Sequence, residues 1–229
     1  MEPNILSIIL YGSHARKDYD ESSDYDICVI TKERKNEELN IKELEEAIDP
    51  LELSEANIVC YPEAVLDSML AHGSLFLWHL KLEGKVLYGA QYFNDKLHGL
   101  ARFKTHYEEI KYHAELFHDL KRAWDLLSFV NELDLSLLFT IVRNTCMVLA
   151  HRAGKPSFGR VSSFHSAKEP YPNLPITFDQ YLYLSRWKLL YERESSPPMA
   201  LPNSDDFGKL LFAIDNFLQF AIQKIVQNA

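Results

Sequence analysis

The pattern of apolar and polar positions changes character near residue 93. Before that point, short apolar runs rich in β-branched and aromatic residues predict strands at 5–11, 25–31, 57–61 and 85–88. Apolar residues spaced three or four apart among charged ones predict helices at 35–48, 64–70 and 75–82. Strands and helices alternating within so short a segment predict an α+β or α/β domain over residues 1–92.

After residue 93 the strand pattern fades and only helical spacing remains. Four long amphipathic stretches predict helices at 97–130, 134–152, 177–191 and 205–227. Asp134 and Asp205 are suited to cap the second and the fourth of these, and Gly154 followed by Pro156 ends the second. Residues 93–229 are therefore predicted to form an all-α helical bundle.

Length and charge support this division into two domains. The chain has 229 residues, more than a single domain usually needs, and a formal net charge of −9. Residues 1–92 hold 8 Lys and Arg against 18 Asp and Glu, whereas residues 93–229 hold 16 against 15. The acidic first part indicates either a cation site or a solvated acidic helix around 37–46. The overall charge disfavours a sequence-independent nucleic-acid binder.

Cysteine usage and hydropathy bear on the compartment. Cys28, Cys60 and Cys146 lie in apolar runs without CxxC spacing, which argues against a disulfide framework or structural zinc and favours a reducing cytoplasm. No uninterrupted apolar run reaches the roughly 18–20 residues of a membrane span. Residues 1–11 lack the basic region and the cleavage site of a signal peptide. We therefore expect a cytoplasmic protein without a membrane partner.

The segment from Leu10 to Ile30 carries the candidate chemistry. Gly12-Ser13 ends a predicted strand where a helix could begin, a place where free backbone N–H groups and a hydroxyl suit a phosphate. Asp24 and Asp26 stand two apart at the start of the next predicted strand, so both carboxylates are expected on one face. Paired carboxylates beside a phosphate site are the ligands that Mg²⁺ prefers.

This combination resembles the nucleotidyltransferase superfamily of the DNA polymerase β type, whose signature reads GSxAR followed by SDxD. The motif here is Gly12-Ser13-His14-Ala15-Arg16 and then Ser23-Asp24-Tyr25-Asp26. The GS-x10-DxD spacing is also similar to that of minimal nucleotidyltransferase antitoxins paired with HEPN toxins. The resemblance covers roughly residues 5–90 and implies an α+β nucleotidyltransferase fold with a mixed sheet. The helical remainder resembles the substrate-binding or HEPN-like domains often attached to it.

The resemblance also implies roles for particular residues. Asp24 and Asp26 would be catalytic metal ligands for Mg²⁺ or Mn²⁺, and the residues implied to bind the NTP are Gly12, Ser13, Arg16 and Ser23. A third carboxylate usually completes the metal site and acts as base, but Asn57 occupies its expected position. Asparagine brings no charge and cannot serve as a base. Glu55 is our candidate for the third catalytic carboxylate, with Glu52 more remote, and Lys17 replaces the usual glycine after Arg16.

In the helical part, Arg143 is the candidate for a contact with the triphosphate. It belongs to a group of cations near a predicted helix end, where it could meet the nucleotide across a cleft between the two domains. The alternative is an ordinary helix end, where cations are favoured by the helix dipole. The residues themselves do not decide between the two.

The function implied by the resemblance is transfer of a nucleoside monophosphate, AMP from ATP in the first instance, to a hydroxyl group with release of pyrophosphate. The acceptor is either a small molecule of the aminoglycoside kind or a protein, and a homodimer is left open. Because of Asn57, the second hypothesis is a catalytically impaired nucleotide-binding protein that acts as a regulator or antitoxin by protein contact.

Overall fold

The computed structural model describes residues 4–20, 23–32, 56–127, 129–192 and 199–227. The chain divides into two compact units, Met1–Lys104 and Thr105–Ala229, which are described separately. The predicted helix at 35–48 lies outside the described residues, as do Glu52 and Glu55.

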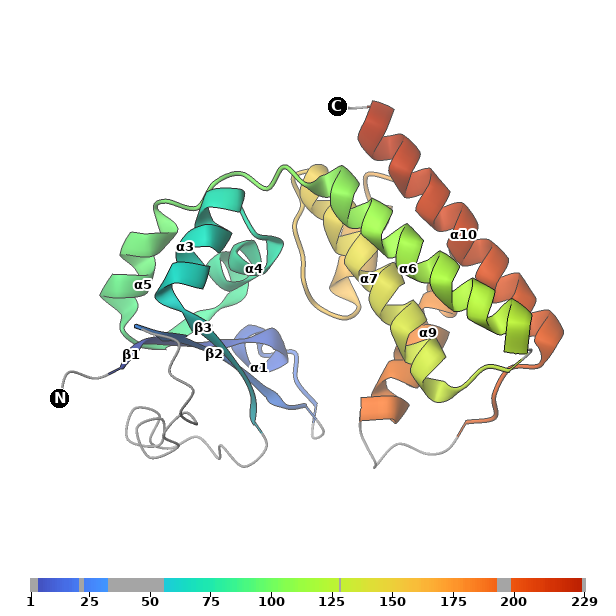
Figure 1. Ribbon diagram of the computed structural model, residues 1–229, viewed down its shortest axis with the longest axis horizontal. Coiled ribbons are helices and arrows are strands. Elements are labelled where there is room, and N and C mark those ends of the chain that lie inside the picture. The colour runs from blue at the N-terminus through green and yellow to red at the C-terminus, as the bar shows by residue number, and fades with distance from the viewer. Residues whose placement is uncertain (1–3, 21–22, 33–55, 128, 193–198, 228–229) are drawn as a thin grey trace. The chain divides into compact units, whose positions relative to one another are not determined.

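The first unit is built on a four-stranded sheet (Figure 1). Its strands lie in the order β3-β2-β1-β4. β1 pairs antiparallel with both β2 and β4, whereas β2 and β3 are parallel. The sheet is therefore mixed, as predicted, and its strands are β1 (Ile5–Tyr11), β2 (Tyr25–Thr31), β3 (Ala56–Pro62) and β4 (Lys85–Tyr88).

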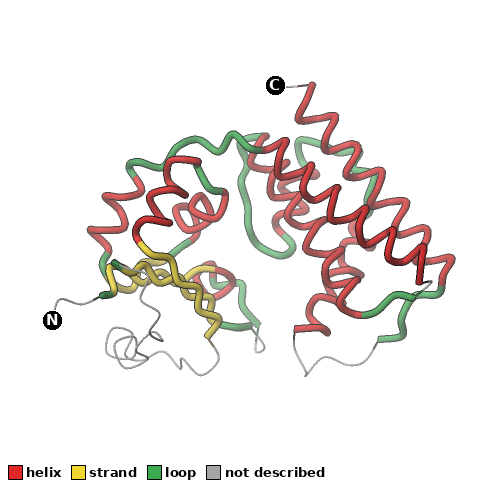
Figure 2. Tube along the Cα trace, in the orientation of Figure 1, coloured by secondary structure: helices red, strands yellow, loops and turns green. Residues whose placement is uncertain are grey.

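Three helices cover one face of this sheet (Figure 2). The alternation of side chains along β1 and β2 sends Ile9, Cys28 and Ile30 into a core with these helices. Ile8, Ile27 and Val29 point to the opposite face and pack with Ala15 of the short helix α1 (Gly12–Arg16). The covering helices are α3 (Glu63–His72), α4 (Leu75–Glu83) and α5 (Ala90–Leu97).

Helix α5 belongs to the first unit because Phe93 and Leu97 are buried in its core. The predicted single helix at 97–130 is wrong at its start, since α5 ends at Leu97 and the next helix, α6, spans His106–Leu127. The spacing of apolar residues continues from α5 into α6. Periodicity alone therefore could not show where α5 ends, or that the two helices belong to different units.

The second unit is helical, as predicted, and α7 (Glu132–Arg152) lies at its centre. Eleven residues of α7 are buried, and the helix contacts each of the other four in the unit. Helix α8 was not expected, because seven residues are too few to show a periodicity. The other helices are α6, α8 (Ser162–Lys168), α9 (Phe178–Glu192) and α10 (Ser204–Gln227).

By length and hydropathy α7 is also the one described helix that could cross a membrane. Of its most apolar window, 61% is buried inside the unit. The apolar character of α7 is thus accounted for by the packing of α6, α8, α9 and α10 around it.

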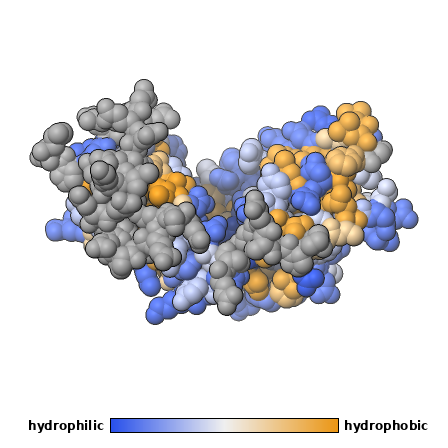
Figure 3. All heavy atoms as spheres, turned by 90° about the horizontal axis from the view of Figure 1, so that it is seen from below, coloured by the Kyte–Doolittle hydropathy of each residue, from blue (hydrophilic) through white to orange (hydrophobic). Residues whose placement is uncertain are grey.

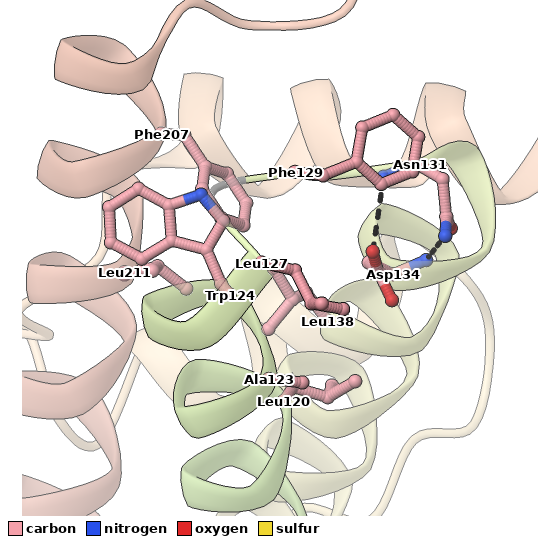
Figure 4. Close-up of a pocket in the computed structure, with 10 residues that line it drawn as sticks. All are labelled: Leu120, Ala123, Trp124, Leu127, Phe129, Asn131, Asp134, Leu138, Phe207 and Leu211. Carbon is pink, nitrogen blue, oxygen red and sulfur yellow. Dashed lines mark hydrogen bonds between the residues drawn. The ribbon is translucent and has the colours of Figure 1, made fainter.

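The turn between α6 and α7 holds a capping box and borders a cavity of about 100 Å³ (Figure 4). Asn131, not Asp134 as predicted, is the N-cap: its side chain accepts from the Asp134 N–H, and the Asp134 carboxylate accepts from the Asn131 N–H.

Apolar residues of α6 and α10 line the cavity, where Trp124 of α6 packs edge-on against Phe207 of α10. Apolar atoms are exposed on the helical unit (Figure 3), and Leu126 is 84% exposed.

The three cysteines are free thiols, but they differ in exposure. Cys28 and Cys146 are buried, in line with their apolar surroundings in the sequence, and burial raises the pKa of the Cys28 thiol to about 12. Cys60 is exposed on β3, although its apolar neighbours in the sequence are typical of a buried position. β3 ends the strand order of the sheet, so the apolar run around Cys60 marks a strand at the edge.

Candidate functional site

The end of β1 and the start of β2 lie side by side at one end of the two central strands of the sheet. Tyr11 is paired with Asp26 across the antiparallel ladder, and Gly12 follows directly with a φ of +72°. A Cβ atom at Gly12 would lie 2.0 Å from Oδ2 of Asp26. The Asp26 carboxylate therefore rests against the Gly12 backbone, and this position requires glycine both for its conformation and for the space.

The parallel pairing of β2 with β3 brings Asn57 beside Asp26. The two residues are direct partners in the register of these strands. Asp26 shares a face with Cys28 and Ile30, and Asn57 shares it with Val59 and Tyr61, which border the core beneath the helices. The side-chain amide of Asn57 and the carboxylate of Asp26 thus project from neighbouring strands on the same face.

Tyr11 is a third group on this face that the sequence analysis did not single out. It packs against the same core, and its ring meets Phe76 and His79 of α4 edge-on. Burial, and secondly the negative charge of Asp26, raise the pKa of the Tyr11 hydroxyl. Because its hydroxyl stays protonated, Tyr11 can donate a hydrogen bond to an oxygen atom of a bound molecule.

Asp24 directly precedes β2 and is exposed. With Asp26 it supplies two carboxylates, and Asn57 adds an amide oxygen, so the donor set is made of oxygen atoms suited to Mg²⁺ or Mn²⁺. Among the residues that the structure describes, no group of three His, Cys, Asp or Glu side chains could hold a metal ion. Glu55, the predicted third carboxylate, is outside those residues.

The backbone after α1 bears on one departure from the family motif. Lys17, which replaces the usual glycine, adopts the left-handed conformation with a φ of 67°. The Asp18 N–H then donates to the Ser13 carbonyl at 3.1 Å and closes the helix. The position therefore has the conformation that favours glycine, and lysine occupies it with some strain.

Arg16 and Ser23, both predicted to bind nucleotide, are engaged within the first unit. The Arg16 guanidinium donates to Asp18 at 3.1 Å and to Glu83 of α4 at 3.0 Å. Ser23 Oγ accepts from the Asp20 N–H and donates to the Asp20 carboxylate, directly before Asp24. In this structure both side chains therefore already have protein partners.

The ion pair of Glu83 with Arg16 connects α4 to α1. The sequence analysis did not predict it, because 67 positions separate the two residues. His79 approaches the same carboxylate oxygen at 3.3 Å, and all three side chains are less than one-fifth exposed. We expect Glu83→Ala to lower the free energy of unfolding by about 1–2 kcal/mol, because it leaves Arg16 partly buried without this acceptor. Chemical denaturation measures the change.

The surface pair Lys111–Glu115, about 60% exposed on α6, is the matched control. Glu115→Ala is expected to change stability by less than about 0.5 kcal/mol, since exposed pairs contribute little. An equal effect of the two substitutions would contradict the role given to Glu83.

Arg143 lies on α7 in the second unit. Its Nη2 donates to the carbonyl oxygen of Phe158 at 2.6 Å, so it holds the segment between α7 and α8. Tyr181 of α9 donates to the Arg160 carbonyl in the same segment. A role of Arg143 in nucleotide binding stays a prediction.

A comparison with known protein families agrees with the fold and the motif of the first unit. Residues 1–93 match the family model described as Polymerase beta, Nucleotidyltransferase. No curated protein gives a significant match to the chain. The match covers the whole sheet, with Gly12-Ser13 at the end of β1 and the two aspartates at the start of β2. Residues 1–93 of this chain are therefore a nucleotidyltransferase domain of the DNA polymerase β type.

Proposed function

We propose that this protein is a Mg²⁺-dependent nucleotidyltransferase of the cytoplasm. In this proposal it transfers a nucleoside monophosphate, AMP from ATP in the first instance, to a hydroxyl group of an acceptor and releases pyrophosphate. The observation that carries the proposal is the contact between Gly12 and Asp26, which brings the two halves of the motif together at one edge of the sheet. The domain match supports nucleotidyl transfer in general.

Each part of the site has a proposed task. The backbone of Gly12 and the backbone and hydroxyl of Ser13 hold the phosphates, with Arg16, Ser23 and Arg143 as the further predicted contacts. Asp24 and Asp26 hold Mg²⁺ or Mn²⁺, and Glu55 is proposed as the third carboxylate and base. When bound, the metal neutralises charge on the triphosphate. The protein's own contribution is positioning of the α-phosphate and the acceptor hydroxyl.

The acceptor is proposed to be a small molecule of the aminoglycoside kind or a protein. The first unit carries the excess of acidic residues in the chain, which suits a cationic acceptor. A nucleic acid is disfavoured by the net charge of −9.

The experiment that tests the nucleotide part is calorimetric titration with each non-hydrolysable NTP, with and without Mg²⁺. Binding that requires Mg²⁺ supports the site and the proposed reaction. Failure of every NTP to bind contradicts the proposed function and directs the search to protein partners.

A catalytically impaired nucleotide-binding protein is the second candidate, favoured by the register that pairs Asn57 with Asp26. We expect Asn57→Asp to tighten Mg²⁺ binding in the nucleotide complex about tenfold or more, because it adds a charge beside Asp26. Titration of the NTP-saturated protein with Mg²⁺ measures this.

Asn57→Ala serves as the control, and it is expected to weaken Mg²⁺ binding if the amide oxygen is a ligand. Equal Mg²⁺ affinity in the wild type and both variants would place the third donor elsewhere, and Glu55→Gln would then be the informative change. Catalysis gained by Asn57→Asp and absent from the wild type would favour the impaired protein.

A further inference from the structure

His14 occupies the variable position of the GSxAR motif, directly after Ser13. Its Nε2 lies 2.8 Å from the carbonyl oxygen of Ser23. A carbonyl oxygen only accepts, so Nε2 carries the proton and donates it. The carbonyl of Ser23 belongs to the peptide that leads into Asp24. The bond therefore ties α1 to the peptide immediately before the first aspartate.

The His14 ring makes a second connection on the other side of Asp24. It stacks on Tyr25 with 3.9 Å between ring centroids and 19° between planes. Tyr19 stacks on it as well, at 4.4 Å and 9°. Tyr25 stands between Asp24 and Asp26 in the sequence, so His14 contacts the chain both before and after Asp24.

Among the residues that the structure describes, the strand ladders do not include Asp24. The ladder with β3 begins at Tyr25, paired with Ala56, and the ladder with β1 reaches only as far as Asp26. The described residues 17–20 and 23–24, which lead from α1 to β2, contain no helix or strand. Asp24 is exposed and follows directly on this segment. Its backbone position relative to Gly12-Ser13 therefore depends on contacts such as those of His14.

We propose that His14 is a positioning residue, whose hydrogen bond to the Ser23 carbonyl holds Asp24 at a set place relative to Gly12-Ser13, so that one metal ion can contact both Asp24 and the phosphates. This inference rests on the proposed function. It assigns a task to a side chain outside the set proposed to hold the nucleotide and the metal. Without this tether, the hydrogen bond from His14 to the Ser23 carbonyl, Asp24 must be ordered when the metal–nucleotide complex binds. The affinity for that complex then falls by the free-energy cost of the ordering.

The test compares His14→Gln with His14→Met. Glutamine and methionine have nearly the same length and volume, and both remove the aromatic ring, but only the glutamine amide can donate to the Ser23 carbonyl. The measurement is calorimetric titration with a non-hydrolysable ATP analogue, with and without Mg²⁺. Thermal unfolding of each variant is followed in parallel.

We expect His14→Met to weaken Mg²⁺-dependent binding about tenfold or more and His14→Gln about threefold or less, with similar unfolding temperatures for the two. Any residual binding of the nucleotide without Mg²⁺ is expected to stay within about twofold of the wild type in both, because Gly12-Ser13 is unchanged.

Wild-type affinity in His14→Met overturns the inference and leaves the proposed function intact. Equal losses in both variants also overturn it, since the ring packing and not the tether would then be responsible. Absence of any Mg²⁺-dependent binding in the wild type overturns the proposed function and this inference with it. If His14→Met does not fold, Tyr19→Leu, which removes the outer ring and keeps the tether, is expected to bind as the wild type, and a tenfold loss there contradicts the inference.

Discussion

Replacing Asp24 and Asp26 together by asparagine is expected to abolish Mg²⁺-dependent binding of a non-hydrolysable NTP, with a loss of affinity of about 100-fold or more. Asparagine has nearly the same shape as aspartate, so the sheet edge and the Gly12 contact with residue 26 are retained. What is lost is two negative charges at the position of the proposed divalent cation, and hard cations depend on such charges. Calorimetric titration with and without Mg²⁺ measures the effect.

A double variant on the helical unit provides the matched control. Glu115→Gln with Asp125→Asn also removes two negative charges, but from exposed positions of α6. Its Mg²⁺-dependent binding is expected to equal that of the wild type. Unchanged binding in the Asp24/Asp26 variant would overturn the assignment of the metal site itself. Equal losses in both double variants would show an effect of net charge and not of the site.

Gly12→Ala is expected to reduce both stability and binding. Alanine at a φ of +72° is strained by roughly 1–2 kcal/mol. Its Cβ would also lie 2.0 Å from Oδ2 of Asp26, so the carboxylate must move away from the backbone. We expect the free energy of unfolding to fall by about 1–3 kcal/mol and Mg²⁺-dependent NTP affinity to fall about tenfold or more. Chemical denaturation and calorimetry measure the two changes.

Gly154→Ala separates backbone strain from displacement of the carboxylate. Gly154 has a φ of +75°, and in the described part of the chain no atom beyond its two chain neighbours lies within 4 Å of the Cβ that alanine would add. This control is expected to destabilise the helical unit by about 1 kcal/mol and to leave nucleotide binding unchanged. If Gly12→Ala binds Mg²⁺ and NTP as tightly as the wild type, the close approach of Gly12 to Asp26 has no part in the site.

Much of the sheet was predictable from local patterns. β1, β2 and β4 have the predicted ends, because turn-forming residues such as Gly12 and Gly89 follow two of these strands directly. In the structure, the alternation along β2 puts Asp26 on the same face as Cys28 and Ile30, whereas Asp24 lies just before the strand. Such patterns are local, and each is set by the backbone conformation of a few residues.

Other features could not be read locally. The apolar spacing from Phe93 through Ile110 continues across two helices that pack into different cores. The ion pair of Arg16 with Glu83 joins residues 67 positions apart. The N-cap at Asn131 was assigned to Asp134, because both residue types suit that position and only the direction of the hydrogen bonds separates them.

The sequence by itself determined the mixed α+β character of the first unit, the helical character of the second, and the motif that joins Gly12-Ser13 to Asp24 and Asp26. Each depends on residue types at short spacing, which fixes local conformation and the face of a strand. Only the tertiary structure decided that Asn57 pairs with Asp26, that Arg16 pairs with Glu83, and that His14 connects both sides of Asp24. Strand register and long-range contacts follow from the packing free energy of the whole unit, which no single segment contains.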